Sequence, residues 1–262
     1  MSGKILITGK GLLGKFLKEY FNAEFLDVDI TKYKDTPKCD ILIHTAAWTN
    51  VEECEINIDK AYKTNTIGSY NLIKNFKGKF IYISSTGIYG DYKKDEYIEF
   101  DEVKPTTVHH KSKYEGEKIV RDLSNDFLIL RTGWLYGNKN DFVTNRIKEA
   151  KNKIVYSDPT QIGNPTYILD LAKQIEVLFD EKGIFNCVNN GSISRFEYVK
   201  TIYEYLNLEV ELIEKEYKRV APVSKNESAK NYKLELLDKN VMRDSKEALK
   251  DYLDGINLNE LL

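Results

Sequence analysis

The sequence predicts an α/β fold in which a doubly wound parallel sheet is joined to a smaller C-terminal lobe. Short runs of β-branched residues alternate with longer segments of helical spacing, a pattern typical of βαβ units. The run 41–43 is apolar throughout, as expected for a strand that is buried on both faces of a sheet. A glycine-rich turn lies between the first predicted strand and the first predicted helix. Together these three observations indicate a parallel α/β sheet.

The first half of the chain contains most of the predicted sheet. Its strands are expected at residues 4–8, 24–29, 40–44, 80–83 and 127–131. Helical spacing predicts helices over residues 12–21, 59–76 and 107–123. The stretch 90–105 is acidic, aromatic and without periodicity, so we expect a loop there.

The second half continues the same alternation more loosely. We expect helices over residues 168–179, 194–206 and 245–253. Strands are expected at 184–188 and 210–213, and the charged segment 215–232 is expected to be a surface loop. Residues 1–155 and 156–262 should form a larger and a smaller lobe of one compact unit, with their segments interleaved.

The composition of the chain excludes several classes of protein. Its 262 residues contain 39 Lys and Arg against 41 Asp and Glu, so nothing indicates a partner that is a nucleic acid or a membrane. No apolar run approaches the roughly 20 residues that cross a bilayer. Three scattered cysteines and three histidines suit no metal site. The N-terminus leads directly into a predicted strand and leaves no room for a signal peptide, so we expect a cytoplasmic protein.

The glycine-rich turn has the pattern G-x-G-x-x-G at Gly9, Gly11 and Gly14. Gly9 allows the tight turn, Gly11 lets the backbone approach a pyrophosphate, and Gly14 lets the helix pack close to the strand. Leu12 and Leu13 begin the predicted helix, whose free N–H groups and dipole attract phosphates. We therefore predict that this turn of a Rossmann-type sheet binds NAD or NADP. An ordinary glycine-rich turn is the alternative.

An acidic residue supports the first interpretation. Asp29 lies 20 positions beyond Gly9, at the end of the second predicted strand, where a carboxylate can accept hydrogen bonds from the adenosine ribose. The alternative is that Asp29 caps the next helix. The acid favours NAD by repelling a 2′-phosphate, but Lys10 and Lys32 could offset that repulsion. The choice between NAD and NADP therefore stays open.

Five further segments carry a resemblance to a known family. They are residues 44–52 (HTAAWTNVE), 84–86 (SST), 111–117 (KSKYEGE), 131–137 (RTGWLYG) and 161–166 (QIGNPT). From about residue 5 to residue 166 the chain resembles the dTDP-4-dehydrorhamnose reductase family, and it does so more weakly to its end. These proteins are extended short-chain dehydrogenases/reductases that act on nucleotide-linked sugars. The combination of segments in this order is far more specific than any one of them.

The resemblance implies a role for each part of the chain. Residues 1–155 would be an NAD(P)-binding Rossmann domain and residues 156–262 a lobe that binds a nucleotide sugar, with a homodimer as an expected assembly. Cofactor contacts beyond the glycine turn are expected at Asp29, Ile30, Ala46, Ala47, Trp48, Asn65 and Lys113. Substrate contacts are expected at Thr49, Val51, Thr86 and Trp134. Trp134 either packs its flat face on a sugar ring or is buried in the core.

The same resemblance implies a catalytic helix with one departure. The superfamily uses Tyr-x-x-x-Lys, whose two side chains share a helix face; the lysine holds the nicotinamide ribose and the tyrosine exchanges a proton with the substrate. Here the lysine is Lys113, and His109 stands where the tyrosine is expected. The hydroxyl that orients the substrate oxygen is expected to be Thr86, with Ser85 beside it. Gly87 replaces an acid of the rhamnose reductases, which makes 86–90 more similar to nucleotide-sugar epimerases.

Three hypotheses account for His109. It replaces the tyrosine as general acid/base, since the reference pKa of histidine is about 6.5, although Lys113 should lower that pKa. A neutral imidazole donates a proton poorly but could serve as a base for alcohol oxidation. Alternatively, His109 is only a surface or packing residue and catalysis is lost. In the third hypothesis Tyr89, Tyr114 or a water donates the proton.

Three functions follow from these alternatives. The first is an NAD(P)-dependent reductase of a nucleotide-linked 4-keto-6-deoxysugar. The second is a cofactor-binding protein without turnover, a role that the β regulatory subunit of methionine adenosyltransferase has within this family. The third is an epimerase or dehydratase. The family's Arg-Pro pair near residues 228–234 is absent, and Arg219 and Lys225 lie close enough in sequence to substitute for it.

Overall fold

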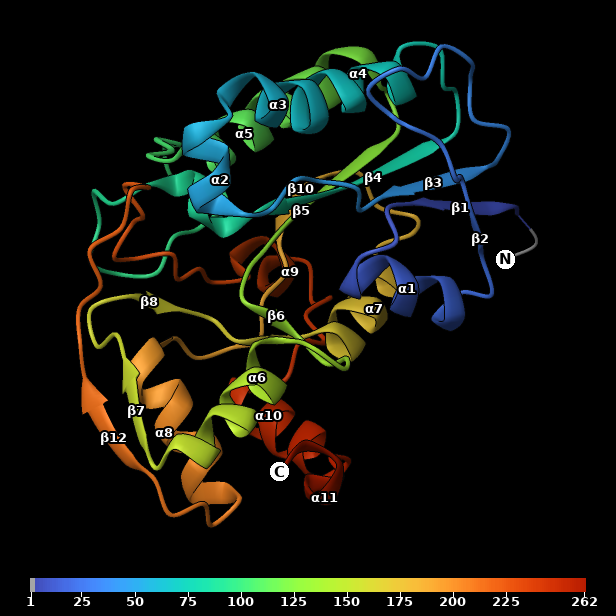
Figure 1. Cartoon of the computed structure of the whole chain (residues 1–262). Coiled ribbons are helices and arrows are strands. Elements are labelled where there is room, and N and C mark those ends of the chain that lie inside the picture. Colours follow the sequence, from blue (N-terminus) through green and yellow to red (C-terminus); the bar gives the residue numbers. More distant parts are fainter. Residues whose placement is uncertain (1–2) are drawn as a thin grey trace.

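The central feature of the fold is a parallel sheet of six strands, seen near the middle of the computed structural model in Figure 1, which describes residues 3–262. The strand order across the sheet is β10-β5-β4-β3-β1-β2. The strands are β1 (Ile5–Thr8), β2 (Glu24–Phe25), β3 (Ile41–His44), β4 (Lys79–Ser85), β5 (Phe127–Thr132) and β10 (Gly183–Asn186). The predicted fold class is confirmed. The prediction for the first residues falls partly on Met1 and Ser2, which lie outside the described residues.

Helices cover both faces of this sheet, as the doubly wound prediction requires (Figure 1). One face is covered by α2 (Val51–Ile56), α3 (Ile58–Tyr62), α4 (Gly68–Ile73) and α5 (Val108–Leu123). The other face is covered by α1 (Leu12–Tyr20) and α7 (Ile168–Val177). Alternate residues of β3 show the two layers, because Ile41 and Ile43 pack with α1 and α7, whereas Leu42 packs with Leu72 of α4.

The helix predicted over 59–76 is interrupted in its middle. The π-helical turn Lys63–Ile67 separates α3 from α4. Such single π-helical turns are frequent at functional sites, and periodicity does not reveal them because the side chains on either side keep helical spacing. The turn contains Asn65, one of the predicted cofactor contacts.

The smaller lobe packs around its own apolar core below the sheet in Figure 1. Its helices are α6 (Phe142–Glu149), α8 (Arg195–Tyr205), α10 (Ser245–Asp254) and α11 (Leu258–Leu261). Its paired strands are β7 (Ile154–Ser157) with β12 (Glu211–Glu214) and β8 (Ile162–Gly163) with β11 (Ile193–Ser194). Short pieces connect the lobe to the sheet: β6 (Leu135–Tyr136), β9 (Thr166–Tyr167) and α9 (Tyr232–Leu236). Two 3-10 turns complete the elements, Thr86–Tyr89 and Ala150–Asn152.

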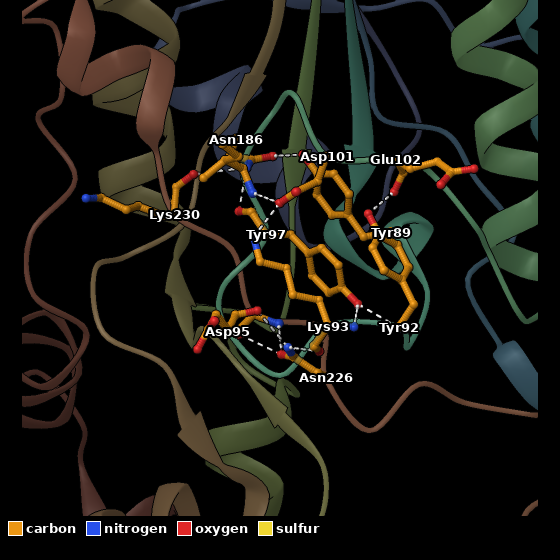
Figure 2. A network of polar contacts seen from close by, with 12 residues as sticks. Tyr89, Tyr92, Lys93, Asp95, Tyr97, Asp101, Glu102, Asn186, Asn226 and Lys230 are labelled. Carbon is orange, nitrogen blue, oxygen red and sulfur yellow. Dashed lines mark hydrogen bonds and ion pairs between the residues drawn. The ribbon is translucent and has the colours of Figure 1, made fainter.

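The chain passes between the lobes more than once. It leaves the sheet after β5, builds α6 and β7, and then returns with α7 and β10 to complete the sheet. Both predicted loops are irregular and lie against each other, but the segment 215–232 is not wholly at the surface, because Ser224 and residues 226–229 are buried. Tyr97 forms a bridge with Ala229, and the surrounding polar contacts are drawn in Figure 2. No helix within residues 3–262 is long and apolar enough to cross a membrane.

Candidate active site

The glycine-rich turn joins β1 to α1 at the carboxyl end of the sheet. Gly9 has a φ of 88°, in the left-handed region that favours glycine, and a Cβ at this position would lie 2.6 Å from the backbone nitrogen of Ala46. A Cβ on Gly14 would overlap the carbonyl oxygen of Gly9. Gly11 differs, because a Cβ there would meet no atom within 4 Å. Gly9 and Gly14 therefore close the turn, whereas Gly11 faces open space.

The N-terminus of α1 is open to the same space. Gly11 is its N-cap residue, no side chain caps the helix, and its first turn has no acidic residue. The first N–H groups of a helix lack partners within the helix, and its dipole favours negative charge. This end of α1 is thus suited to a phosphate.

A cleft of about 830 Å³ begins at this turn and runs along the carboxyl ends of the strands. Most of the predicted cofactor contacts line it, namely Gly9, Gly11, Leu12, Leu13, Gly14, Asp29, Ile30, Ala46, Ala47 and Lys113. Thr49, predicted to contact substrate, also lines it. Ser84 and Thr132 also line it, although their hydroxyl oxygens are sealed from solvent and have no hydrogen-bond partner. The volume of the cleft and its glycine cradle fit a bound dinucleotide.

Asp29 lines the cleft, but it does not lie at the end of a strand. β2 covers only Glu24–Phe25, so the predicted strand 24–29 is wrong in its second half. The exposed Asp29 carboxylate accepts hydrogen bonds from the backbone N–H (3.0 Å) and hydroxyl (2.7 Å) of Thr31, which lower its pKa. Lys10 forms an ion pair with Asp27 at 2.5 Å, and Lys32 lies 3.6 Å from Asp29. Lys10 is therefore paired with a different acid, whereas Lys32 lies beside Asp29 itself, where its charge offsets the carboxylate.

Trp48 and Asn65 are placed behind the cleft rather than among the residues that line it. The half-buried Trp48 ring lies 4.0 Å from the Lys60 amine, and its Nε1 donates to Glu53. The buried Asn65 side chain accepts a hydrogen bond from the backbone N–H of Trp48 at 2.8 Å and donates one to its carbonyl at 3.2 Å. Asn65 also donates to the Ser112 hydroxyl of α5. Its amide therefore connects the loop 45–50 to α5.

His109 lies one helical turn before Lys113 on α5 and lines the cleft. Its Nδ1 is 3.0 Å from the carbonyl oxygen of Trp48, which can only accept, so Nδ1 carries the proton. Burial, followed by the charges of His110 and Lys113, lowers the pKa of His109 to about 3. At neutral pH His109 is therefore an uncharged imidazole with Nε2 available as a hydrogen-bond acceptor.

Lys113 projects from α5 to the end of β4. Its amine donates to the carbonyl oxygen of Ile83 at 2.6 Å and lies 4.0 Å from the centre of the Tyr82 ring. Burial lowers the pKa of Lys113 to about 7, and Glu117 opposes that shift. The lysine is therefore held at the end of β4, beside the cleft, with a weakened positive charge.

The structure separates the two candidate hydroxyls. Ser85 ends β4 and lines the cleft, and its oxygen accepts a hydrogen bond from the backbone N–H of Gly87 at 3.2 Å. Thr86 is buried and is not among the residues that line the cleft or the neighbouring cavity. Its hydroxyl lies behind Gly133, where a Cβ would come within 2.7 Å of it. Ser85 thus lines the cleft directly, and the Thr86 hydroxyl lies beside Gly133, which lines the cleft as well.

A second cavity of about 360 Å³ adjoins the cleft. The residues that line both spaces are Ser85, His109, Gly133 and Trp134. Three arginines, Arg146, Arg195 and Arg219, contribute to the second cavity, as does Val51. Arg219 lines this cavity although it is also paired with Glu52 at 3.9 Å. Lys225, paired with Glu216 at 3.1 Å, does not line it.

Trp134 sits at the junction of the two spaces with a φ of 48°. A bulky residue adopts this left-handed conformation at a cost of about 1–3 kcal/mol, and such residues cluster at functional sites. Its Nε1 donates to Glu227 at 3.0 Å, and the Arg195 guanidinium carbon lies 3.4 Å from the centre of its ring. The ring is half-buried, with one face covered by Arg195 rather than wholly enclosed in the core.

The tyrosines of the third hypothesis are placed away from this junction. Tyr89 is buried, donates to Asn186 and accepts from Arg131, and its pKa is raised by burial. Tyr114 contacts Lys118 on the outer side of α5. Neither is among the residues that line the two spaces. Nor do residues 3–262 contain a cluster of three His, Cys, Asp or Glu that could hold a metal.

The fold and the site together define a dinucleotide-binding α/β protein of the extended short-chain dehydrogenase/reductase class. A model of the RmlD substrate binding domain matches residues 4–258, and the chain belongs to this family. The predicted resemblance is confirmed.

Three named proteins show what the chain is similar to. The spore coat polysaccharide biosynthesis protein SpsK of Bacillus subtilis is 36% identical over 66% of this chain, and the match spans 64% of that protein. The solved dTDP-4-dehydrorhamnose reductase of Clostridium acetobutylicum is 33% identical with a TM-score of 0.89, covering 96% of this chain and 98% of its own. That of Bacillus anthracis, solved with NADP, is 30% identical with a TM-score of 0.90, covering 98% and 100%.

Proposed function

We propose that the protein is an NAD(P)-dependent reductase of a nucleotide-linked 4-keto-6-deoxysugar. The observation that carries this proposal is the junction of two spaces at Ser85, His109 and Trp134. One space begins at a phosphate-binding turn, and the other is lined by three arginines. Relatives that share the fold over nearly their whole length are named dTDP-4-dehydrorhamnose reductases.

Each part of the site has a role in this proposal. Bound NAD(P)H would supply a hydride to the sugar carbonyl carbon. Gly11 and the N-terminus of α1 hold the pyrophosphate, and Lys113 holds the nicotinamide ribose. Ser85 donates a hydrogen bond to the sugar carbonyl oxygen at the junction. The arginines of the second cavity attract the diphosphate of the nucleotide.

His109 is the proton-transfer residue in this proposal. Reduction requires an imidazolium that donates from Nε2, whereas oxidation of a hydroxyl requires the neutral form that accepts there. Because burial holds the pKa of His109 near 3, the neutral form predominates at pH 7. We therefore expect reduction to be slow at neutral pH and faster in acid.

The second candidate function is a cofactor-binding protein without turnover. The state of His109 favours this second candidate. Its Nδ1 is bonded to the Trp48 carbonyl oxygen, and burial keeps the imidazole uncharged. The two candidates share the cleft and differ only in chemistry at the junction.

A paired assay separates the two candidates. Cofactor binding is measured by the fluorescence of NADH and NADPH, which also decides between them. Their oxidation is then followed with dTDP-4-keto-6-deoxyglucose from about pH 5.5 to about pH 8. Binding with oxidation supports the reductase, and binding without oxidation at any pH supports the protein without turnover. Light scattering of the same samples tests the expected homodimer.

A further inference from the structure

One buried carboxylate at the junction has an oxygen without a partner. Glu227 is 8% exposed and lines the second cavity. Its Oε2 accepts a hydrogen bond from Trp134 Nε1 at 3.0 Å, whereas its Oε1 has no hydrogen-bond partner among residues 3–262. Oε1 is also not sealed from solvent by the surrounding protein. It is therefore accessible from the cavity.

Arg195 lies close to this carboxylate without pairing with it. The guanidinium covers the Trp134 ring at 3.4 Å, and its Nε donates to Gln161 at 3.3 Å. Within the described chain no ion pair shorter than 4.0 Å joins Arg195 to Glu227. The indole thus keeps a cation on its face and an anion at its edge, and both retain hydrogen-bonding capacity toward the cavity.

Hydrogen bonds fix the backbone on both sides of Glu227, and Figure 2 shows those that Asn226 forms with Lys93 and Asp95. The Asn226 side-chain amide donates to the carbonyl oxygens of Lys93 (2.9 Å) and Asp95 (3.0 Å). Its Oδ1 accepts from the backbone N–H and the hydroxyl of Ser228. The N–H of Glu227 itself donates to the Ile162 carbonyl at 2.8 Å. The carboxylate is therefore held in place before any ligand binds.

This arrangement becomes costly when a ligand displaces solvent from Oε1 without replacing its hydrogen bond. Burial raises the pKa of Glu227, and the contacts with Trp134 and Arg195 oppose that shift. A buried carboxylate accepts hydrogen bonds at both oxygens, and an acceptor left unmet in a complex weakens that complex. A ligand group that donates to Oε1 avoids the cost, and a ligand without a donor incurs it.

We propose that Glu227 determines substrate specificity by accepting a hydrogen bond at Oε1 from a hydroxyl or amino group on the sugar ring. This inference rests on the proposed function and deepens it: the substrate is a nucleotide sugar that carries such a donor beside Trp134. A sugar that is deoxygenated at that ring carbon is discriminated against.

The position of Glu227 assigns it to the sugar rather than to the rest of the nucleotide. A carboxylate repels a diphosphate, which the arginines Arg146 and Arg219 attract. Trp134, the partner of Glu227, lines both spaces together with His109 and Ser85. The reacting sugar must reach that junction, so it is the part of the ligand that passes Glu227.

The test measures the contribution of the sugar to binding, and it requires no turnover. Calorimetry on the full chain with NADP gives dissociation constants for dTDP, for dTDP-glucose, and for the 2-deoxy and 3-deoxy analogues. The unmodified protein is compared with Glu227→Ala and Glu227→Gln. Glu211→Gln, an exposed site on β12, is the control with the same change of charge as Glu227→Gln.

We expect the unmodified protein to bind one deoxy analogue about 10-fold more weakly than dTDP-glucose, because a hydrogen bond to a charged group is lost. In Glu227→Ala that difference should vanish. The loss of the sugar hydroxyl and the loss of the carboxylate together form a double-mutant cycle. Glu227→Gln, which keeps an acceptor oxygen, should retain part of it. Glu211→Gln should behave as the unmodified protein, and dTDP alone should bind all four proteins with no loss of affinity.

Two results would overturn the inference while leaving the proposed function intact. One is that every deoxy analogue binds the unmodified protein as tightly as dTDP-glucose, a comparison that needs no variant. The other is that the difference persists in Glu227→Ala. If the unmodified protein binds neither dTDP nor dTDP-glucose, the proposed function fails, and the sugar assigned to Glu227 fails with it.

Discussion

His109 donates its Nδ1 proton to the backbone carbonyl of Trp48 across 3.0 Å, so a loop beside the cleft sets the tautomer of the residue at the proton-transfer position. The same carbonyl also accepts from Asn65, whose side chain binds the N–H of Trp48 as well. The only nitrogen of His109 left for chemistry is Nε2, and at neutral pH it is an acceptor. The predictions for the chemistry follow from this arrangement.

The rate of reduction should fall as the pH rises. Burial lowers the pKa of His109 to about 3, so above that pH the protonated fraction decreases about tenfold per pH unit. We expect kcat/KM for NADPH oxidation to fall by about that factor per unit between about pH 5.5 and pH 8. Initial rates corrected for acid decay of NADPH measure it. A profile that rises with pH would contradict the assignment of His109 as the donor.

Replacing His109 by tyrosine should accelerate reduction at neutral pH. A phenol retains its proton at pH 7 and can donate it, which the neutral imidazole does not do from Nε2. We expect His109→Tyr to raise kcat about tenfold or more and to flatten the acid dependence. His109→Phe, which fills similar space without a proton, is the matched control. A collapse of activity in His109→Tyr would show that a phenol cannot replace the imidazole at this position.

Two glycines of the same turn should respond differently to alanine. A Cβ on Gly14 overlaps the carbonyl oxygen of Gly9, so Gly14→Ala should destabilise the fold by at least about 1–3 kcal/mol. Gly11→Ala meets no protein atom and should leave the unfolding midpoint unchanged. It should still weaken NADP binding about tenfold or more, because the methyl group enters the space assigned to the pyrophosphate. Unfolding curves and fluorescence titrations of both variants test this. Unchanged NADP affinity in Gly11→Ala would contradict the placement of the cofactor.

Acid should destabilise the protein through its buried histidines. Burial lowers the pKa of His44 and His109 to about 3 and that of His110 to about 4. The unfolded chain binds protons first, near pH 6.5, so stability is full above that pH and is lost as the pH falls toward the folded values. Each histidine should remove about 1.5 kcal/mol between pH 6.5 and pH 5.

His44→Gln provides the measurement for that prediction. His44 lies between Thr8 and Ser69, at 2.6 Å and 3.1 Å, and glutamine can accept from the first and donate to the second. Urea unfolding at both pH values should show a smaller acid loss in the variant, by about 1.5 kcal/mol. Equal losses in both proteins would mean that His44 is protonated in the folded state as readily as in the unfolded one.

Asn65→Ala should reduce both stability and activity. The variant leaves the backbone N–H of Trp48 without its acceptor, which costs about 1–3 kcal/mol for a buried group. The loop that holds His109 also loses its connection to α5, so kcat should fall more than NADP affinity. Asn71→Ala, which removes a side chain that bonds to the Ile30 carbonyl, is a control on the same helical segment. An equal fall of kcat in both variants would contradict a positioning role for Asn65.

Features that are local in sequence could be predicted, and features that depend on register could not. The apolar strands and the glycine turn carry their signal within about ten residues. Whether Ser85 or Thr86 lines the cleft depends on a single residue, because β4 ends at Ser85 and Thr86 begins a 3-10 turn. Trp48, predicted to contact the cofactor, instead lies behind the cleft, and its backbone carbonyl rather than its ring contacts His109.

The second cavity had almost no signal in the sequence. Arg146 comes from α6, Arg195 from the start of α8, and Glu227 from an irregular segment that only tertiary contacts hold. The helix α6 was not predicted. The strands β6 and β9 were not predicted either, since each has only two residues and a pair of residues has no periodicity. Such residues converge only when the smaller lobe folds against the sheet.

The late position of β10 in the chain has a consequence for synthesis. β10 pairs with β5 in parallel, from Gly183 opposite Leu128 to Asn186 opposite Arg131. A ribosome makes β5 more than fifty residues before β10, so the growing chain exposes a free hydrogen-bonding edge on β5 during that interval. Open edges of this kind promote aggregation. Chaperone demand should therefore peak while residues 133–182 are being translated and fall once β10 has emerged.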